Sequence, residues 1–153
     1  MKKWMVAAPV ALWVVTVAAA GYVFVRGHTI PATDGRTTVL LQPGERDFVL
    51  SEMRLLLGVV KDITGGLAEG SNAKVAAAAR SVGMAATHDA PSSLLAKLPL
   101  DFKRMAMPLH GGFDDLAAAA ERGETPAALA GRLGEQLGRC NQCHSAYRFD
   151  QVQ

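Results

Sequence analysis

The chain opens with one continuous apolar run, and helical periodicity replaces this run further along. Residues 4–25 are apolar apart from Pro9, Thr16 and Gly21. About 22 residues rising about 1.5 Å each span roughly 33 Å as a helix, and the hydrocarbon core of a bilayer is about 30 Å thick. The run therefore predicts a transmembrane helix, a signal anchor, over residues 1–26.

The flanks of this run indicate how the chain meets the membrane. Lys2 and Lys3 precede it and hold the N-terminus in the cytoplasm, so the rest of the chain is expected on the periplasmic side of the inner membrane. The alanines at 18–20 are an alternative processing site, which would release a soluble periplasmic form. Because the apolar run continues to Val25 and carries aromatic residues near both ends, we expect an uncleaved anchor.

Residues 27–44 have prolines and glycines but no helical periodicity. This composition predicts a linker between the membrane segment and a domain over residues 45–153. The short apolar run at 39–41 is compatible with packing on the domain, but it does not by itself predict a strand.

Four amphipathic segments follow, and each predicts a helix. The first covers residues 45–67 and carries a stripe spaced by four and three residues, at Val49, Met53, Leu56, Val60, Ile63 and Leu67. The second begins at Ser71 or Asn72 as the N-cap and extends to about Thr87, with an alanine-rich inner face. The third covers residues 101–122, where Pro108 and two glycines predict a kink or a two-piece helix.

The fourth segment starts at Thr125 and Pro126, a capping hydroxyl followed by proline at the first helical position. Its inward stripe runs into residues with distinctive chemistry: Leu129, Leu133, Leu137, Cys140, His144 and Tyr147. Four helices with short connections predict an all-α, antiparallel four-helix bundle, whose interior is a common place for a cofactor.

Composition and charge narrow the classes of partner. Ala, Gly and Leu dominate, and β-branched runs outside the N-terminus are short, as expected of an all-α domain. The formal net charge of +2, without blocks of like charge, is too small to argue for a nucleic-acid partner, and none is expected.

The residues from Cys140 to His144 read CNQCH and contain both cysteines of the chain. A CxxCH string is typical of covalent haem attachment, because two thiols three residues apart bond the porphyrin vinyl groups while the histidine ligates iron. The sequence therefore predicts one covalently bound haem c.

Three other interpretations of this string stay open at this point. A thioredoxin-like dithiol belongs on the first turn of a helix after a strand, and no strand-like run precedes Cys140. A structural zinc site needs a fourth ligand, such as His88 or His110, in addition to the clustered Cys140, Cys143 and His144. The last alternative is a pair of buried, inert cysteines.

The block RCNQCHSAYRF at the end of the last predicted helix resembles the class II c-type cytochromes, the group of cytochrome c′ and cytochrome c556. FDDLAAAAERG, over residues 113–123, supports the resemblance. The resemblance implies that Cys140 and Cys143 form the thioether bonds and that His144 is the proximal iron ligand. It also implies that Arg148 lies beside the proximal side of the haem.

The family divides according to the other side of the iron. The low-spin, electron-transferring members have a methionine ligand on the first bundle helix, and Met53 stands at about the matching position. In the cytochrome c′ members that place is occupied by a side chain that does not ligate, and the iron binds small gases. Met105, Met107 and His110, near the predicted kink of the third helix, are the rivals of Met53.

The resulting hypothesis is a membrane-anchored monohaem cytochrome, not an enzyme, that carries single electrons between redox partner proteins through His/Met-ligated iron. The alternative is a five-coordinate protein that binds nitric oxide or carbon monoxide. A helical interaction module without haem is a third interpretation. The resemblance also makes a homodimer possible, although no exposed apolar stripe in the sequence is specific to one.

Overall fold

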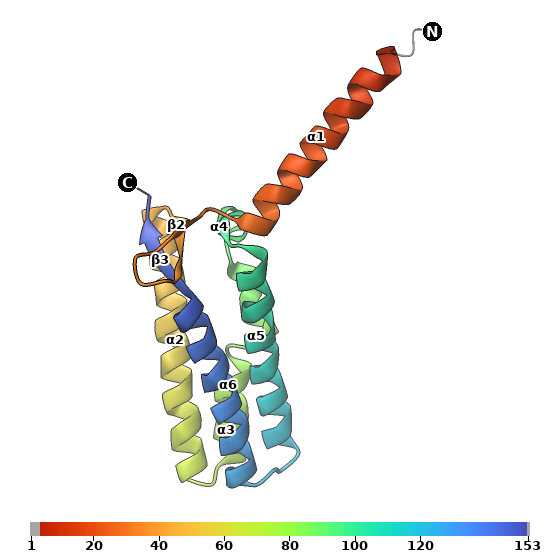
Figure 1. Ribbon diagram of the computed structural model, residues 1–153. Helices are drawn as coiled ribbons and strands as arrows, with labels where there is room; N and C mark the ends of the chain where they lie inside the picture. The colour runs from red at the N-terminus through yellow and green to blue at the C-terminus, as the bar shows by residue number, and fades with distance from the viewer. Residues whose placement is uncertain (1–3, 153) are drawn as a thin grey trace.

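The computed structural model describes residues 4–152 and shows a mostly helical chain with a small sheet at one end (Figure 1). In chain order, the elements are α1 (Trp4–Arg26), β1 (Thr29–Pro31), β2 (Thr37–Leu41), α2 (Pro43–Ala68), α3 (Asn72–Arg80), the 3₁₀ helix η1 (Met84–Asp89), α4 (Ser92–Lys97), α5 (Leu100–Glu121), α6 (Pro126–Ala146) and β3 (Tyr147–Gln151).

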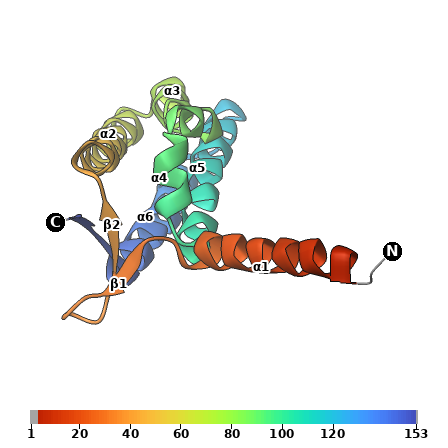
Figure 2. The ribbon, with the colours of Figure 1, turned by 90° about the horizontal axis from the view of Figure 1, so that it is seen from above.

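Helix α1 projects away from the other elements (Figures 1 and 2). Its stretch Ala7–Arg26 is 20 residues long, has a mean hydropathy of 2.0 and buries none of its residues inside the protein. A helix of this length and composition can cross a membrane, as predicted from the sequence. Lys2 and Lys3, which carried the orientation argument, lie outside the described residues.

The end of α1 is fixed against the turn between α4 and α5. Gly27 follows α1 with a φ of +65°, and a Cβ at this position would overlap the backbone of residues 97–99. The amide of His28 donates a hydrogen bond to the carbonyl of Lys97 at 2.8 Å. Only glycine combines this dihedral with this close approach, so the junction depends on residue 27.

The larger core lies where α2, α3, α5 and α6 meet (Figure 2). Ile63, Leu116 and Leu129 are at most 1% exposed there, and full burial of such a side chain stabilises the fold by roughly 1.5–3 kcal/mol. The helices predicted over residues 45–67 and 101–122, and the one predicted from Thr125 onward, are confirmed to within a few residues. At the start of α6 the Thr125 hydroxyl accepts from the amide of Ala128, as an N-cap should.

The helix predicted from residue 72 to about Thr87 is wrong in its second half. Helix α3 ends at Arg80, and Met84–Asp89 form the 3₁₀ helix η1 instead. The cause lies on α5, because the carboxylate of Asp114 accepts the amide of Met84 at 2.8 Å and caps η1. A Cβ at Gly83 would overlap that carboxylate, so the close approach of Asp114 requires glycine at this position.

Of the two forms predicted for the third helix, kinked or in two pieces, the two-piece form is wrong, because α5 is one helix that contains Pro108. Proline lacks the N–H that would bond to the carbonyl four residues earlier. Pro108 lies on the exposed side of α5, where water can satisfy that carbonyl. The helix therefore continues through the proline to Glu121.

The segment predicted as a linker contains two strands of a three-stranded sheet in the order β1-β2-β3. Strand β2 pairs antiparallel with β1 and parallel with β3, and Val39 lies opposite Phe149. Val39 and Leu41 are fully buried, so this segment belongs to the folded unit. Tyr147, predicted on the helical stripe, is instead the first residue of β3.

Candidate functional site

A large, mostly apolar cavity lies between the core described above and the sheet end of the molecule. Its volume is about 570 Å³, within the range of roughly 300–1,000 Å³ that is usual for small-molecule sites. Its walls come from α2, η1, α4, α5 and α6. They include, in addition to aliphatic and aromatic side chains, the predicted site residues Met53, Cys140, Cys143 and His144, together with Met105, Met107 and His110.

Helix α6 brings the two thiols and the imidazole to this cavity. Cys140 and Cys143 are half-buried and unbonded, and His144 follows in the last turn at the exposed rim. Burial raises the pKa of both thiols, and the neighbouring Cys140 raises that of Cys143 further. Near neutral pH both groups are therefore protonated thiols that face an apolar space.

The pKa values bear on the dithiol interpretation. A reactive CxxC pair needs a thiolate, which a helix N-terminus or a nearby cation stabilises. These cysteines lie near the C-terminal end of α6, where the helix dipole disfavours negative charge. Their raised pKa values are the opposite of what thioredoxin-like chemistry requires.

The zinc interpretation lacks a ligand set in the part of the chain that the structure describes. Within residues 4–152, no three side chains among His, Cys, Asp and Glu are gathered in a way that could hold a metal ion. His110 lines the same cavity as the cysteines, whereas His88 is an exposed residue of η1 outside its lining.

The sheet holds the C-terminal end of α6 in place. Phe102 of α5 packs edge-on against Tyr147 and Phe149 of β3, with ring centroids 5.4 and 5.5 Å apart. Arg36, from the turn before β2, donates to the carbonyl of His144 at 3.3 Å. This contact satisfies a free carbonyl at the end of α6 and positions the residue that bears the imidazole.

Met53 stands on the α2 wall of the cavity. Its half-buried side chain packs against a second cluster of buried residues, defined here as the sheet-end cluster: Val39, Leu41, Val49, Leu94, Leu98 and Phe102. Cys143 of α6 packs against the same cluster. The structure therefore brings Met53 and the cysteine motif to one space, although 87 to 91 residues separate them in the chain.

The rivals of Met53 all lie on the α5 wall. Met105 is half-buried, and Met107 is 39% exposed at the rim. The Nδ1 atom of His110 lies 2.8 Å from the carbonyl of Val82. Because a carbonyl oxygen can only accept, Nδ1 carries the proton and Nε2 carries the lone pair in the neutral ring.

The inward-facing apolar stripe of α6 is not packed in the core along its whole length, because Leu137 is partly exposed at the cavity. It was predicted to point inward with Leu129 and Leu133, yet it is 41% exposed and lines the cavity. Leu57 and Met107, also on the cavity wall, are 71% and 39% exposed. Three large apolar side chains around one opening suit an apolar ligand.

Arg148 lies apart from this cavity. It is on β3, with its guanidinium 3.3 Å from the carboxylate of Asp150, and it is not among the lining residues. The role that the resemblance implies for Arg148, beside the proximal side of a haem, has no support from this placement.

Two cationic residues at the site, Arg36 and Lys103, could not be identified from the sequence. Arg36 falls within the predicted linker, and its contact with His144 depends on the unforeseen sheet. Lys103 lines the cavity from α5, and burial lowers the pKa of its ammonium group. In the sequence Lys103 stands between Asp101 and Arg104, and nothing there distinguishes it from a surface lysine.

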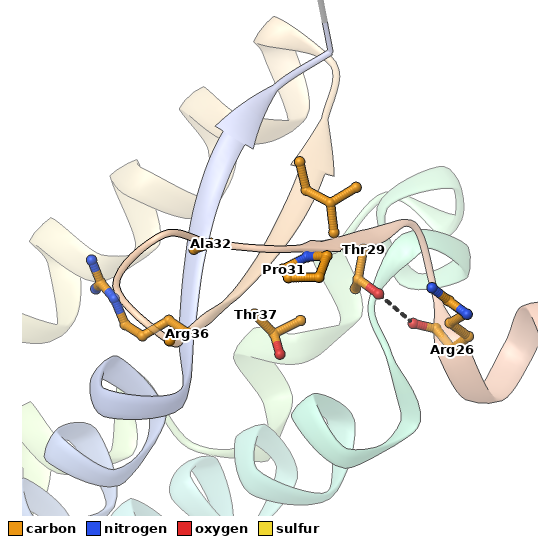
Figure 3. A pocket seen from close by; sticks show the side chains of 8 residues that line it. Arg26, Thr29, Pro31, Ala32, Arg36 and Thr37 are labelled. Atoms are coloured by element: carbon orange, nitrogen blue, oxygen red, sulfur yellow. Dashed lines mark hydrogen bonds between the residues drawn. The ribbon is translucent and has the colours of Figure 1, made fainter.

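A second hollow, of about 410 Å³, lies beside the β1–β2 turn (Figure 3). Arg26 and Arg36 stand at its two ends, and the hydroxyl of Thr29 donates to the carbonyl of Arg26 at 3.3 Å. Its lining includes no thiol, imidazole or carboxylate: Arg26, Thr29, Ile30, Pro31, Ala32, Gly35, Arg36 and Thr37. None of the predicted site residues line it, so the larger cavity is the candidate site.

Comparisons of the chain with protein-family models, with curated proteins and with solved structures returned no match.

Proposed function

We propose that the protein is a membrane-anchored, monohaem c-type cytochrome that carries single electrons. One observation carries the proposal: a single apolar cavity is lined both by the cysteines and histidine of the CxxCH motif and by Met53 from another helix. In this proposal α2, α3, α5 and α6 form an antiparallel four-helix bundle that encloses the cofactor.

The described residues fit a haem in three respects. The cavity is large and mostly apolar, as a porphyrin face requires. Protonated, half-buried thiols at Cys140 and Cys143 face it, spaced for two thioether bonds. His144 offers an imidazole from the next position of the same helix.

In this assignment Cys140 and Cys143 tether the haem, and His144 and Met53 ligate its iron. A haem held between histidine and methionine supplies reversible one-electron transfer at a raised potential. The protein's part is to exclude water with the sheet-end cluster and to hold the ligands in place. Arg36 contributes by fixing the backbone of His144.

Helix α1 supports attachment to a membrane. None of its residues over Ala7–Arg26 is buried inside the protein, and Gly27 at its end lies against the backbone of residues 97–99. Together with the lysines before it in the sequence, this supports an anchor in the inner membrane with the domain on the periplasmic side. The partners would then be redox proteins of that compartment.

The test is an absorption spectrum of the full chain, produced in a bacterium with a haem-loading system and purified in detergent. We expect low-spin features in both oxidation states and no change when carbon monoxide is added to the reduced protein. Rapid binding of carbon monoxide would contradict electron transfer through His/Met-ligated iron and would support the five-coordinate, gas-binding alternative. A colourless protein would overturn the haem assignment itself.

A further inference from the structure

Lys103 is an unusual residue on the cavity wall. Its ammonium nitrogen is buried, and it has no hydrogen-bond partner among residues 4–152. A buried ammonium group without a hydrogen-bond partner is costly, since its three N–H donors have lost water without gaining an acceptor. Burial accordingly lowers the pKa of Lys103. Such a group indicates an anion that completes its surroundings.

The anchor helix holds this ammonium group in position. The Nζ atom of Lys103 lies 4.2 Å from the centre of the Phe24 ring, within the range of a cation–π contact. Phe24 belongs to the last turn of α1, which ends at Arg26. The contact with the ring confines the cation beside the cavity but satisfies none of its N–H donors.

The attachment of a haem through its vinyl groups determines where its propionate carboxylates lie. The vinyl groups of haem lie on one edge and the two propionate carboxylates on the opposite edge. With the vinyl edge bonded to Cys140 and Cys143 on α6, the carboxylates lie toward the other walls. The lysine and arginine residues that line the cavity are Arg54, Lys103 and Arg139, and Arg139 is adjacent to Cys140 on α6 itself. Arg54 is exposed on α2, which leaves Lys103 as the buried cation.

We propose that Lys103, held in place by Phe24 of the anchor helix, pairs with a haem propionate. This inference rests on the proposed function, and it adds that one residue, Lys103, contacts both the cofactor and the membrane helix. The bound carboxylate would satisfy the ammonium donors, and the ring of Phe24 would screen the pair from water. The haem would then stabilise the packing of α1 on α5.

Resonance Raman spectroscopy of the haem-loaded full chain tests this pairing, because the propionate bending bands fall in frequency when a hydrogen bond to the carboxylate is lost. We expect a downward shift in Lys103→Met, which keeps the apolar stem, and recovery of the wild-type band in Lys103→Arg. Phe24→Leu should shift the same band in the same direction but less far.

Arg54→Met is the matched control, since Arg54 lines the same cavity from the exposed side of α2. Its bands should equal those of the wild type, and a shift in Arg54→Met alone would assign the pairing to Arg54 and overturn the inference. Coloured protein with unchanged bands in Lys103→Met would overturn this inference and leave the proposed function standing. Colourless wild-type protein would overturn both.

Discussion

Met53 of α2 and Cys143 of α6 pack against the same sheet-end cluster and line the same cavity. The two residues come from helices at opposite ends of the domain sequence. Their shared cavity is the observation that supports the proposal of one cofactor held by both residues.

The first prediction concerns Met53. Met53→Ala should abolish the weak far-red band that a methionine sulfur gives to ferric haem, and it should lower the reduction potential, because the sulfur ligand raises it. The measurement is an absorption spectrum of oxidised protein combined with a redox titration. Met107→Ala, at the exposed rim of the same cavity, is the control and should leave both unchanged. A far-red band that survives in Met53→Ala would assign the sulfur to another residue.

The second prediction concerns the thiols. Each of Cys140→Ala and Cys143→Ala should keep one thioether bond and show a red-shifted visible band from the remaining free vinyl group. The double variant should lose its haem on a denaturing gel stained for haem. Ser145→Ala, an exposed neighbour on α6, should stain as strongly as the wild type. Haem that stays with the denatured double variant would disprove attachment through these cysteines.

The third prediction tests whether the segment before α2 belongs to the fold. Leu41 is fully buried and Ile30 is 48% exposed, although both are aliphatic residues of the same sheet. Leu41→Ala should lower the free energy of unfolding by about 2–5 kcal/mol through lost burial and a residual cavity. Ile30→Ala should change it by about 0.5 kcal/mol or less. Denaturant titration of the full chain in detergent, followed by circular dichroism, measures both, and equal values would show that β2 is not part of the cooperative unit.

The fourth prediction concerns Glu45, which accepts from Lys97 at 2.6 Å while also capping α2. The hydrogen bond from Lys97 is the main cause of the lowered pKa of Glu45. Because the folded pKa lies below the unfolded value of about 4.3, the pair stabilises the fold above that pH and is lost as pH falls through the folded pKa.

Glu45→Gln should therefore reduce the free energy of unfolding by about 1–3 kcal/mol at neutral pH, with the difference from wild type shrinking below about pH 4. Thermal or denaturant unfolding at several pH values measures it. Glu69→Gln is the comparison, since Glu69 pairs with Lys74 in exposed positions, and it should cost about 1 kcal/mol at most. A difference between Glu45→Gln and wild type that does not depend on pH would contradict the assignment of the ion pair.

The long helices could be predicted because their signals are local. The stripe from Val49 to Leu67 and the cap at Thr125 each lie within one element, and α2 and α6 form where these signals stand. The break after Arg80 could not be predicted, because the carboxylate that caps Met84 comes from Asp114, on another helix. Tertiary contacts override local propensity at that point.

The sheet could not be predicted from local sequence patterns either, because its strands pair over a long distance in the chain. β2 and β3 pair in parallel although more than a hundred residues separate Val39 from Phe149. Neither strand is longer than five residues, so neither has enough alternating positions to be recognised alone. The grouping of Met53 with the CxxCH residues could be expected from the family resemblance, whereas Lys103 and Arg36 required the structure.

We predict that Cys140 and Cys143 carry a covalent haem, and the intact mass of the full chain measures this attachment. After production with a haem-loading system and extraction with acidified acetone, we expect a mass increased by one haem and no remaining reactive thiol. The chain at its unmodified mass, with both cysteines open to alkylation after denaturation, would contradict it.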